Sequence, residues 1–175
     1  MTTGEGLRAS VVLFVAAMLQ VVIVSALVFG GGAPDLLLVT VVALGLLRGS
    51  VPGAAFGFAG GLIVDLLTLA TLGVTSLVLT LAGFWAGRWA ETTVRNRRLA
   101  PLVAVGVISV LAGAFSFVLH WMLGHDVATE YALVTVLVPT LLANLVLAFP
   151  VYFAVRAAAS ERDLLEPAPE VEVLV

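Results

Sequence analysis

Residues 88–98 read Arg-Trp-Ala-Glu-Thr-Thr-Val-Arg-Asn-Arg-Arg, and long apolar segments lie on both sides of this stretch. It contains four of the 8 basic residues of the chain, Arg88, Arg95, Arg97 and Arg98. The other basic residues are Arg8, Arg48, Arg156 and Arg162. Short loops rich in Lys or Arg stay in the cytoplasm. If the chain crosses a membrane six times, every arginine falls on one side, which predicts that both termini are cytoplasmic.

The composition independently indicates a membrane protein. The 175 residues are 62% hydrophobic and 11% charged, with a mean hydropathy of +1.20. Soluble domains are about 45–50% apolar and about 25% charged. A water-soluble fold of this size would have too little interior for so much apolar surface, so the bilayer must act as solvent. The absence of cysteine excludes disulfides and thiolate metal sites, and no basic block suits nucleic-acid binding.

The apolar segments predict an all-α, polytopic six-helix bundle that spans a membrane, with both termini inside the cell. The predicted spans are 9–29, 35–47, 53–69, 72–87, 99–123 and 131–155. Residues 1–160 form the transmembrane domain, and the acidic residues 161–175 are expected to be a disordered cytosolic tail. The first span resembles a secretory signal, but it is longer than the roughly 7–15 residues of a signal core.

The second predicted span is short. Its 13 residues cover about 20 Å of a hydrocarbon core that is about 30 Å thick. A re-entrant segment is the alternative, but it would place Arg48 and the arginines of 88–98 outside the cell. We therefore expect six spans, and whether the second one crosses fully stays open. Asp35, after Pro34, is a plausible helix start because a carboxylate is favoured at a helix N-terminus.

Asp65 is the one carboxylate well inside a predicted span. Gly53, Gly57 and Gly61 precede it at four-residue spacing, a pattern that allows two helices to approach closely. An ionisable group in hydrocarbon usually faces the bundle interior and has a partner or a role. One interpretation of Asp65 is proton or ion coupling. The favoured interpretation is that it caps the turn that leads to the next helix, near Thr68 and Thr71.

Other polar and small residues have similar alternatives. Gly83 and Gly87 form another close-approach pattern, for which packing within the bundle is favoured over dimerisation. Gln20 and Asn144 are lone amides in the first and last spans, and interhelical hydrogen bonds are their expected role. Pro139 and Pro150 should kink the last helix on either side of Asn144.

The inventory of reactive groups predicts neither an enzyme nor a cofactor. No sequence motif of a serine hydrolase, zinc protease, nucleotide-binding loop or dinucleotide site is present. His120, His125 and Asp126 lie near one end of the fifth span, but their spacing matches no dedicated metal site. Hydrogen bonds from these histidines to loop backbone are the favoured interpretation, so no metal is predicted.

Several motifs occur in a characteristic order. They are Pro-Asp-Leu-Leu-Leu at 34–38, Gly-x-x-Gly-Gly-Leu-x-x-Asp-Leu-Leu at 57–67, Leu-x-Gly-Phe-Trp-Ala-Gly-Arg at 81–88 and Asn-x-x-Leu-Ala-x-Pro-Val-Tyr at 144–152. Their order and spacing resemble the bacterial rod-shape-determining membrane proteins of the MreD family. The resemblance covers nearly all of the chain before the tail. It implies a fold similar to the substrate-binding S components of energy-coupling-factor (ECF) vitamin transporters.

The resemblance implies a non-enzymatic scaffold of the elongation (rod) complex, which governs cell shape and side-wall peptidoglycan synthesis. Its implied partners are the transmembrane helix of MreC, the MreB filament, the RodA polymerase and its class B penicillin-binding protein. The basic stretch 88–98 would then face the filament or anionic membrane lipids. The alternative is a small-molecule-binding membrane subunit of the vitamin-transporter type, although the predicted outer halves of the helices offer few polar side chains.

Overall fold

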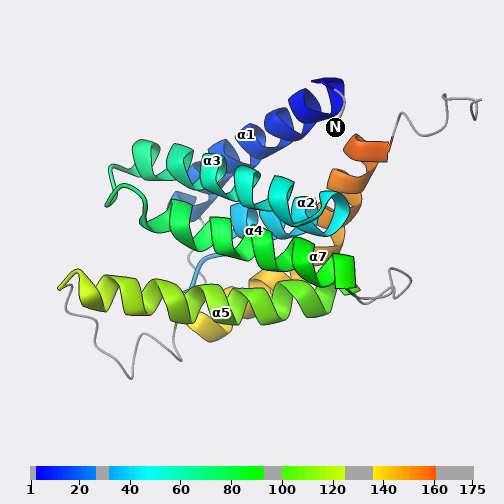
Figure 1. Cartoon of the computed structure of the whole chain (residues 1–175). Helices are drawn as coiled ribbons and strands as arrows, with labels where there is room; N and C mark the ends of the chain where they lie inside the picture. Colours follow the sequence, from blue (N-terminus) through cyan, green and yellow to red (C-terminus); the bar gives the residue numbers. More distant parts are fainter. Residues whose placement is uncertain (1–2, 27–31, 93–99, 125–135, 161–175) are drawn as a thin grey trace, which may run out of the picture.

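The computed structural model describes residues 3–26, 32–92, 100–124 and 136–160. Within these ranges the regular structure is helical and there is no strand, which confirms the all-α prediction. Figure 1 shows the helices in chain order. They are α1 (Thr3–Ala26), α2 (Leu36–Arg48), α3 (Ser50–Thr68), α4 (Val74–Thr92), α5 (Ala100–Met122) and α7 (Leu137–Ser160).

Several helices extend beyond one end of the apolar segment that predicted them. α1 begins at Thr3 rather than residue 9, and α7 continues to Ser160 rather than 155. α4 continues to Thr92, so Arg88 lies in a helix and the prediction that it belongs to a loop is wrong. An apolar segment marks the part of a helix that lies in the hydrocarbon core of the bilayer. The helix itself can extend past this part into water, because its backbone hydrogen bonds continue there. Arg95, Arg97, Arg98 and the tail 161–175 lie outside the described residues.

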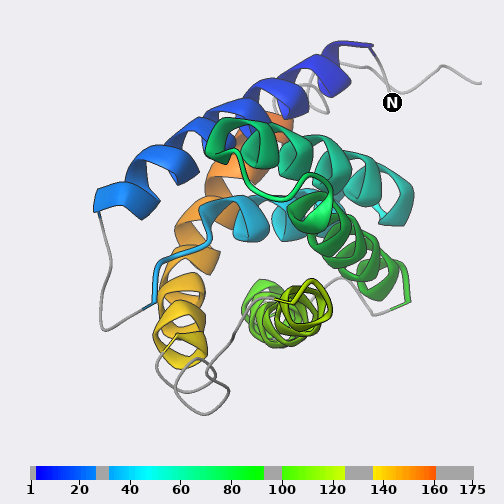
Figure 2. The same cartoon turned by 90° about the vertical axis from the view of Figure 1, so that its left-hand side faces the viewer.

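Helix α2 is the centre of the bundle. It packs against each of the five other described helices, which form a ring in the order α1, α3, α4, α5, α7 and back to α1. In Figure 2, α2 (cyan) lies in the middle, with α1 and α3 above it, α4 to one side, α7 to the other and α5 below. Every residue of α2 from 37 to 45 is buried.

The central position explains how so short a helix is accommodated. A short apolar helix is mismatched to the bilayer only where lipid surrounds it. Here the ring of longer helices, rather than lipid, surrounds α2. The aliphatic side chains of α2, among them Leu37, Val41 and Leu44, fill the core. This arrangement favours apolar residues on all sides of α2, in agreement with its sequence, in which Thr40 is the one polar residue before Arg48.

The outer helices carry large apolar side chains on the surface. Examples on four different helices are Phe14, Phe58, Trp85 and Phe153, each more than half exposed. Among the residues that the structure describes, three helical stretches are long and apolar enough to cross a membrane: Ser50–Thr68, Pro101–Met122 and Leu137–Ala158. A surface of this kind is suited to hydrocarbon rather than water.

Glycines bring α2, α3 and α4 into backbone contact. A Cβ atom on Gly53 or Gly57 would collide with the backbone oxygen of Gly83 or Leu79 on α4. At Gly45 of α2, a Cβ atom would lie 2.6 Å from the same oxygen of Gly83. Close approach of this kind gives van der Waals contact where lipid supplies no hydrophobic force between helices. The three helices therefore form a tightly packed unit within the ring.

The two prolines of α7 differ in position. Pro150 lies inside the helix, which continues past it to Ser160. Pro139 is the third residue of α7, so the prediction that it kinks the helix is wrong. The first turn of a helix has N–H groups without helical acceptors, and a missing N–H costs nothing there.

Candidate functional site

Three groups of polar side chains lie at the junctions where described helices begin. The first junction is the N-terminus of α2, where Asp35 is the N-cap and its Oδ1 accepts a hydrogen bond of 2.9 Å from the Leu38 amide. Gln20 of α1 accepts from the amides of Leu36 at 2.7 Å and Leu37 at 3.4 Å. The same side chain donates to the Pro34 carbonyl oxygen at 3.3 Å.

Asn144 of α7 completes this junction. Its Oδ1 accepts from the Asp35 amide at 2.7 Å, and its Nδ2 donates to the Ser109 hydroxyl of α5 at 3.1 Å. Asn144 is 1% exposed, so water contributes little here. We call the side chains of Gln20, Asp35, Ser109 and Asn144 the amide cluster. It connects α1 and the start of α2 with α5 and α7, which come much later in the sequence.

The amide cluster satisfies a physical requirement. A helix begins with N–H groups that have no acceptor in the helix, and inside a bundle the protein must supply the acceptors. Interhelical hydrogen bonding was the expected role of Gln20 and Asn144, and the contacts show it. The sequence did not identify their common partner, the start of α2, or the contribution of Ser109.

The second junction is the turn between α3 and α4. Asp65 is fully buried, and its Oδ2 accepts from the Gly73 amide at 2.8 Å. Its backbone oxygen accepts from the Ala70 amide at 3.2 Å, next to Leu69 in a left-handed conformation with φ of 52°. The structure thus places Asp65 where a cap of the turn lies. Thr68 instead donates to the backbone oxygen of Val64.

One half of the Asp65 carboxyl group has no such contact. Within the described ranges, Asp65 Oδ1 and Ser76 Oγ are buried without a hydrogen-bond partner. Ser76 packs on Gly61, one helical turn before Asp65, so both atoms belong to the same contact between α3 and α4. The Asp65 carboxyl group therefore holds the turn through one oxygen, Oδ2, which accepts the hydrogen bond from Gly73.

The third junction lies at the opposite end of α3. Glu91, in the last turn of α4, accepts through Oε1 from the amide and from the hydroxyl of Ser50, both at 2.8 Å. These two hydrogen bonds, the backbone bond first, lower the pKa of the Glu91 carboxyl group from its ordinary value, and the nearby Arg88 guanidinium adds to the effect. The Arg88 Nη1 atom lies 3.4 Å from Glu91 Oε2.

The sequence alone did not reveal this third junction. Ser50 is the first residue of α3, and its amide would otherwise be without a helical acceptor. A negative charge at a helix N-terminus is also favourable to the helix dipole. Glu91 reaches it from another helix, because Gly87 allows the backbone around Gly49 to come close.

The polar side chains of the three junctions make hydrogen bonds that hold helices and turns together. Among residues 3–26, 32–92, 100–124 and 136–160, no three His, Asp or Glu side chains could hold a metal ion together. His120 Nδ1 lies 2.8 Å from the backbone oxygen of Ser116 on its own helix. His125 and Asp126 lie outside the described residues.

Comparison of the sequence with models of known protein families shows to which family the chain belongs. The model of one family, the rod shape-determining protein MreD, matches residues 3–159. The chain belongs to the MreD family. The match runs from the first residue of α1 into the last turn of α7, so the resemblance seen in the sequence is confirmed, and with it a membrane protein with a role in rod shape determination. Searches of curated proteins and of solved structures gave no match.

The motifs that resemble MreD coincide with the junctions. Asp35 and Asn144 belong to the amide cluster, Asp65 holds the α3–α4 turn, and Gly83 and Gly87 pack against the backbone of α3. Pro150 follows Asn144 inside α7. The residues that characterise the sequence are therefore those that hold the helices of this MreD protein together.

Proposed function

We propose that this MreD protein is a non-enzymatic membrane scaffold of the rod complex. The observation that carries the proposal is the family match over residues 3–159, combined with three groups of polar side chains that hold helix junctions. In this proposal the chain crosses the bacterial cytoplasmic membrane six times with both termini inside. It binds the transmembrane helix of MreC and through it regulates side-wall peptidoglycan synthesis.

The packing of the bundle supports a scaffold. The α2–α3–α4 unit is held by backbone contacts at glycines, which leave little freedom for rearrangement. Exposed apolar faces on α1, α5 and α7 remain for a partner helix or lipid. MreB, RodA and its class B penicillin-binding protein are proposed as further partners of the assembly, and the basic stretch 88–98 is proposed to face the filament or anionic lipid.

Co-purification from the native membrane tests the scaffold. The protein, extracted in mild detergent, should carry an MreC-like protein with a single transmembrane helix in near-stoichiometric amount. A variant in which exposed Val107 and Leu111 of α5 are both changed to Trp keeps the core intact and tests that face. Recovery of peptidoglycan synthases without any MreC-like protein would contradict the proposal.

The alternative is a vitamin-binding subunit similar to the S components of ECF transporters. Such a protein needs polar side chains around an internal ligand, whereas here α2 fills the middle of the ring and Gln20 and Asn144 bond to its N-terminus. A specific vitamin that raised the unfolding temperature of the purified protein at sub-micromolar concentration would favour this alternative.

A further inference from the structure

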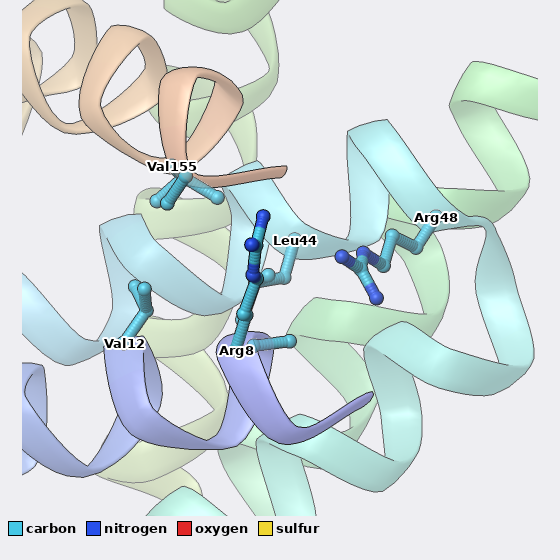
Figure 3. A pocket seen from close by; sticks show the side chains of 7 residues that line it. Arg8, Val12, Leu44, Arg48 and Val155 are labelled. Carbon is cyan, nitrogen blue, oxygen red and sulfur yellow. The ribbon is translucent and has the colours of Figure 1, made fainter. Parts of the chain in front are cut away.

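A small hollow lies where α1, α2 and α7 meet at one end of the bundle. Arg8 comes from the second turn of α1, and Arg48 is the last residue of α2. Val155 and Ala158 of α7 form its third side. Figure 3 shows the two arginine side chains reaching into the same space, with the Arg48 guanidinium directed toward Arg8.

The lining of the hollow combines two kinds of surface. The rim carries two guanidinium groups, and both arginine side chains are partly buried. The remaining lining is aliphatic and includes Val12, Leu44 and Val155, which Figure 3 shows around the Arg8 side chain. The enclosed space is about 10 Å³, room for about one water molecule. A ligand would therefore sit on the rim, with most of its body outside the bundle.

We propose that Arg8 and Arg48 bind the phosphate group of an anionic phospholipid. A guanidinium presents its N–H donors in a planar fork that matches phosphate oxygens, and two forks from different helices can hold one phosphate. The aliphatic side chains beside the two arginines offer an apolar contact to the glycerol and upper acyl region of a lipid that lies against the hollow. A soluble anion would gain nothing from it.

The surrounding surface continues this match. Val11 and Val15 of α1 are about half exposed and lead from the Arg8 end along the helix, as a path for an acyl chain. The site rests on the proposed orientation, in which the N-terminus and Arg48 face the anionic inner leaflet. A lipid held there would join the first, second and last helices of the described bundle.

Lipid retention measured by native mass spectrometry tests the site. The detergent-purified full chain is titrated with phosphatidylglycerol or, separately, with zwitterionic phosphatidylcholine of the same acyl chains. The variants Arg8→Gln and Arg48→Gln are compared with Arg156→Gln. Arg156 is a matched control because it is exposed on α7 beside Val155 but does not line the hollow. Circular dichroism verifies that each variant is folded.

The wild-type protein should retain one phosphatidylglycerol in preference to phosphatidylcholine. Removal of either Arg8 or Arg48 should weaken that retention about fivefold, since one arginine near an anionic surface contributes about 1 kcal/mol. Arg156→Gln should retain the lipid as the wild type does. An equal loss in the Arg156 variant would mean a diffuse charge effect and would overturn the site. Competition by millimolar inorganic phosphate would show a soluble anion as ligand and would also overturn it.

Discussion

At the scale of single residues, we expect replacement of Asn144 to reduce the stability of the bundle. It supplies the acceptor for the Asp35 amide and the donor for the Ser109 hydroxyl, both inside the bundle. Asn144→Ala leaves a buried N–H without an acceptor, which should lower the free energy of unfolding by about 1–3 kcal/mol. Ser109→Ala, the control, removes the acceptor of one Asn144 N–H but keeps the acceptor of the Asp35 amide, so it should cost less than Asn144→Ala. Thermal unfolding in detergent measures both, and equal losses would contradict the role of Asn144.

Two substitutions of Asp65 can distinguish a structural role of its side chain from a role of its ionisable carboxyl group. Asn at this position can still accept from the Gly73 amide, whereas Ala cannot. Asp65→Ala should therefore lower the free energy of unfolding by about 1–3 kcal/mol, and Asp65→Asn should stay close to the wild type. Cell-shape complementation is the second measurement. An Asn variant that is stable but fails to restore rod shape would show that the ionisable group itself is needed, as in ion coupling.

The residue scale also shows what could be derived from the sequence. Asp65, Gln20 and Asn144 stand out because polar side chains in an apolar segment need partners. Their partners do not stand out, since every neighbouring helix is equally apolar and the sequence does not say which helix lies beside which. Glu91 was hidden for another reason. It lies in a charged stretch that looks solvated, and its contact with Ser50 depends on how α4 crosses α3.

At the scale of helices, the glycine contacts of α3 differ sharply from those of α5. A methyl group on Gly57 would strike the backbone of Leu79, whereas one on Gly106 would lie 3.4 Å from the flexible end of Leu145. Gly57→Ala should therefore lower the free energy of unfolding by about 1–3 kcal/mol. Gly106→Ala should be neutral or slightly stabilising because Ala is the better helix former. Similar unfolding temperatures for the two variants would contradict the close packing of α3 on α4.

The junction at Ser50 should make stability depend on pH. The pKa of Glu91 is lowered in the folded protein, so its contribution is present above the ordinary value of about 4.5 and is lost as the pH falls through the folded-state value. Glu91→Gln has no such proton to bind. The difference in unfolding temperature between wild type and Glu91→Gln should therefore shrink from pH 7 to pH 4. A difference that stays constant over this range would show that the carboxylate charge does not support the junction.

The order of helices was accessible from the sequence, but the central place of α2 was not. The breakers at Pro34, Gly49 and Gly73 mark real helix limits, because proline and glycine disfavour continued helix there. Uniform hydrophobicity is compatible with lipid contact or with burial, so composition alone cannot distinguish α2 from α5. The length of α2 was the available signal, since a helix too short for the bilayer is better placed among other helices.

At the scale of the whole molecule, the threading of the chain can be tested directly. The chain contains no cysteine, so single cysteines report without background. Thr71, in the exposed turn between α3 and α4, and Thr92, at the other end of α4, are suitable positions. The proposed topology expects a membrane-impermeant thiol reagent to label Thr71→Cys in intact cells and Thr92→Cys only after the membrane is opened. Labelling of both positions in intact cells would contradict it.

The enclosure of α2 also constrains biogenesis. The ribosome makes α2 after α1 but before α3, α4, α5 and α7, the four other described helices that surround it in the finished bundle. Until those helices are made, α2 is too short to span the bilayer by itself, and the N–H groups at its N-terminus lack some of their acceptors. The insertion machinery must therefore keep α2 out of contact with lipid during this time. Chains truncated after residue 48 should consequently be substrates for membrane quality-control proteases, and the bundle should mature only once the last helix has closed around its centre.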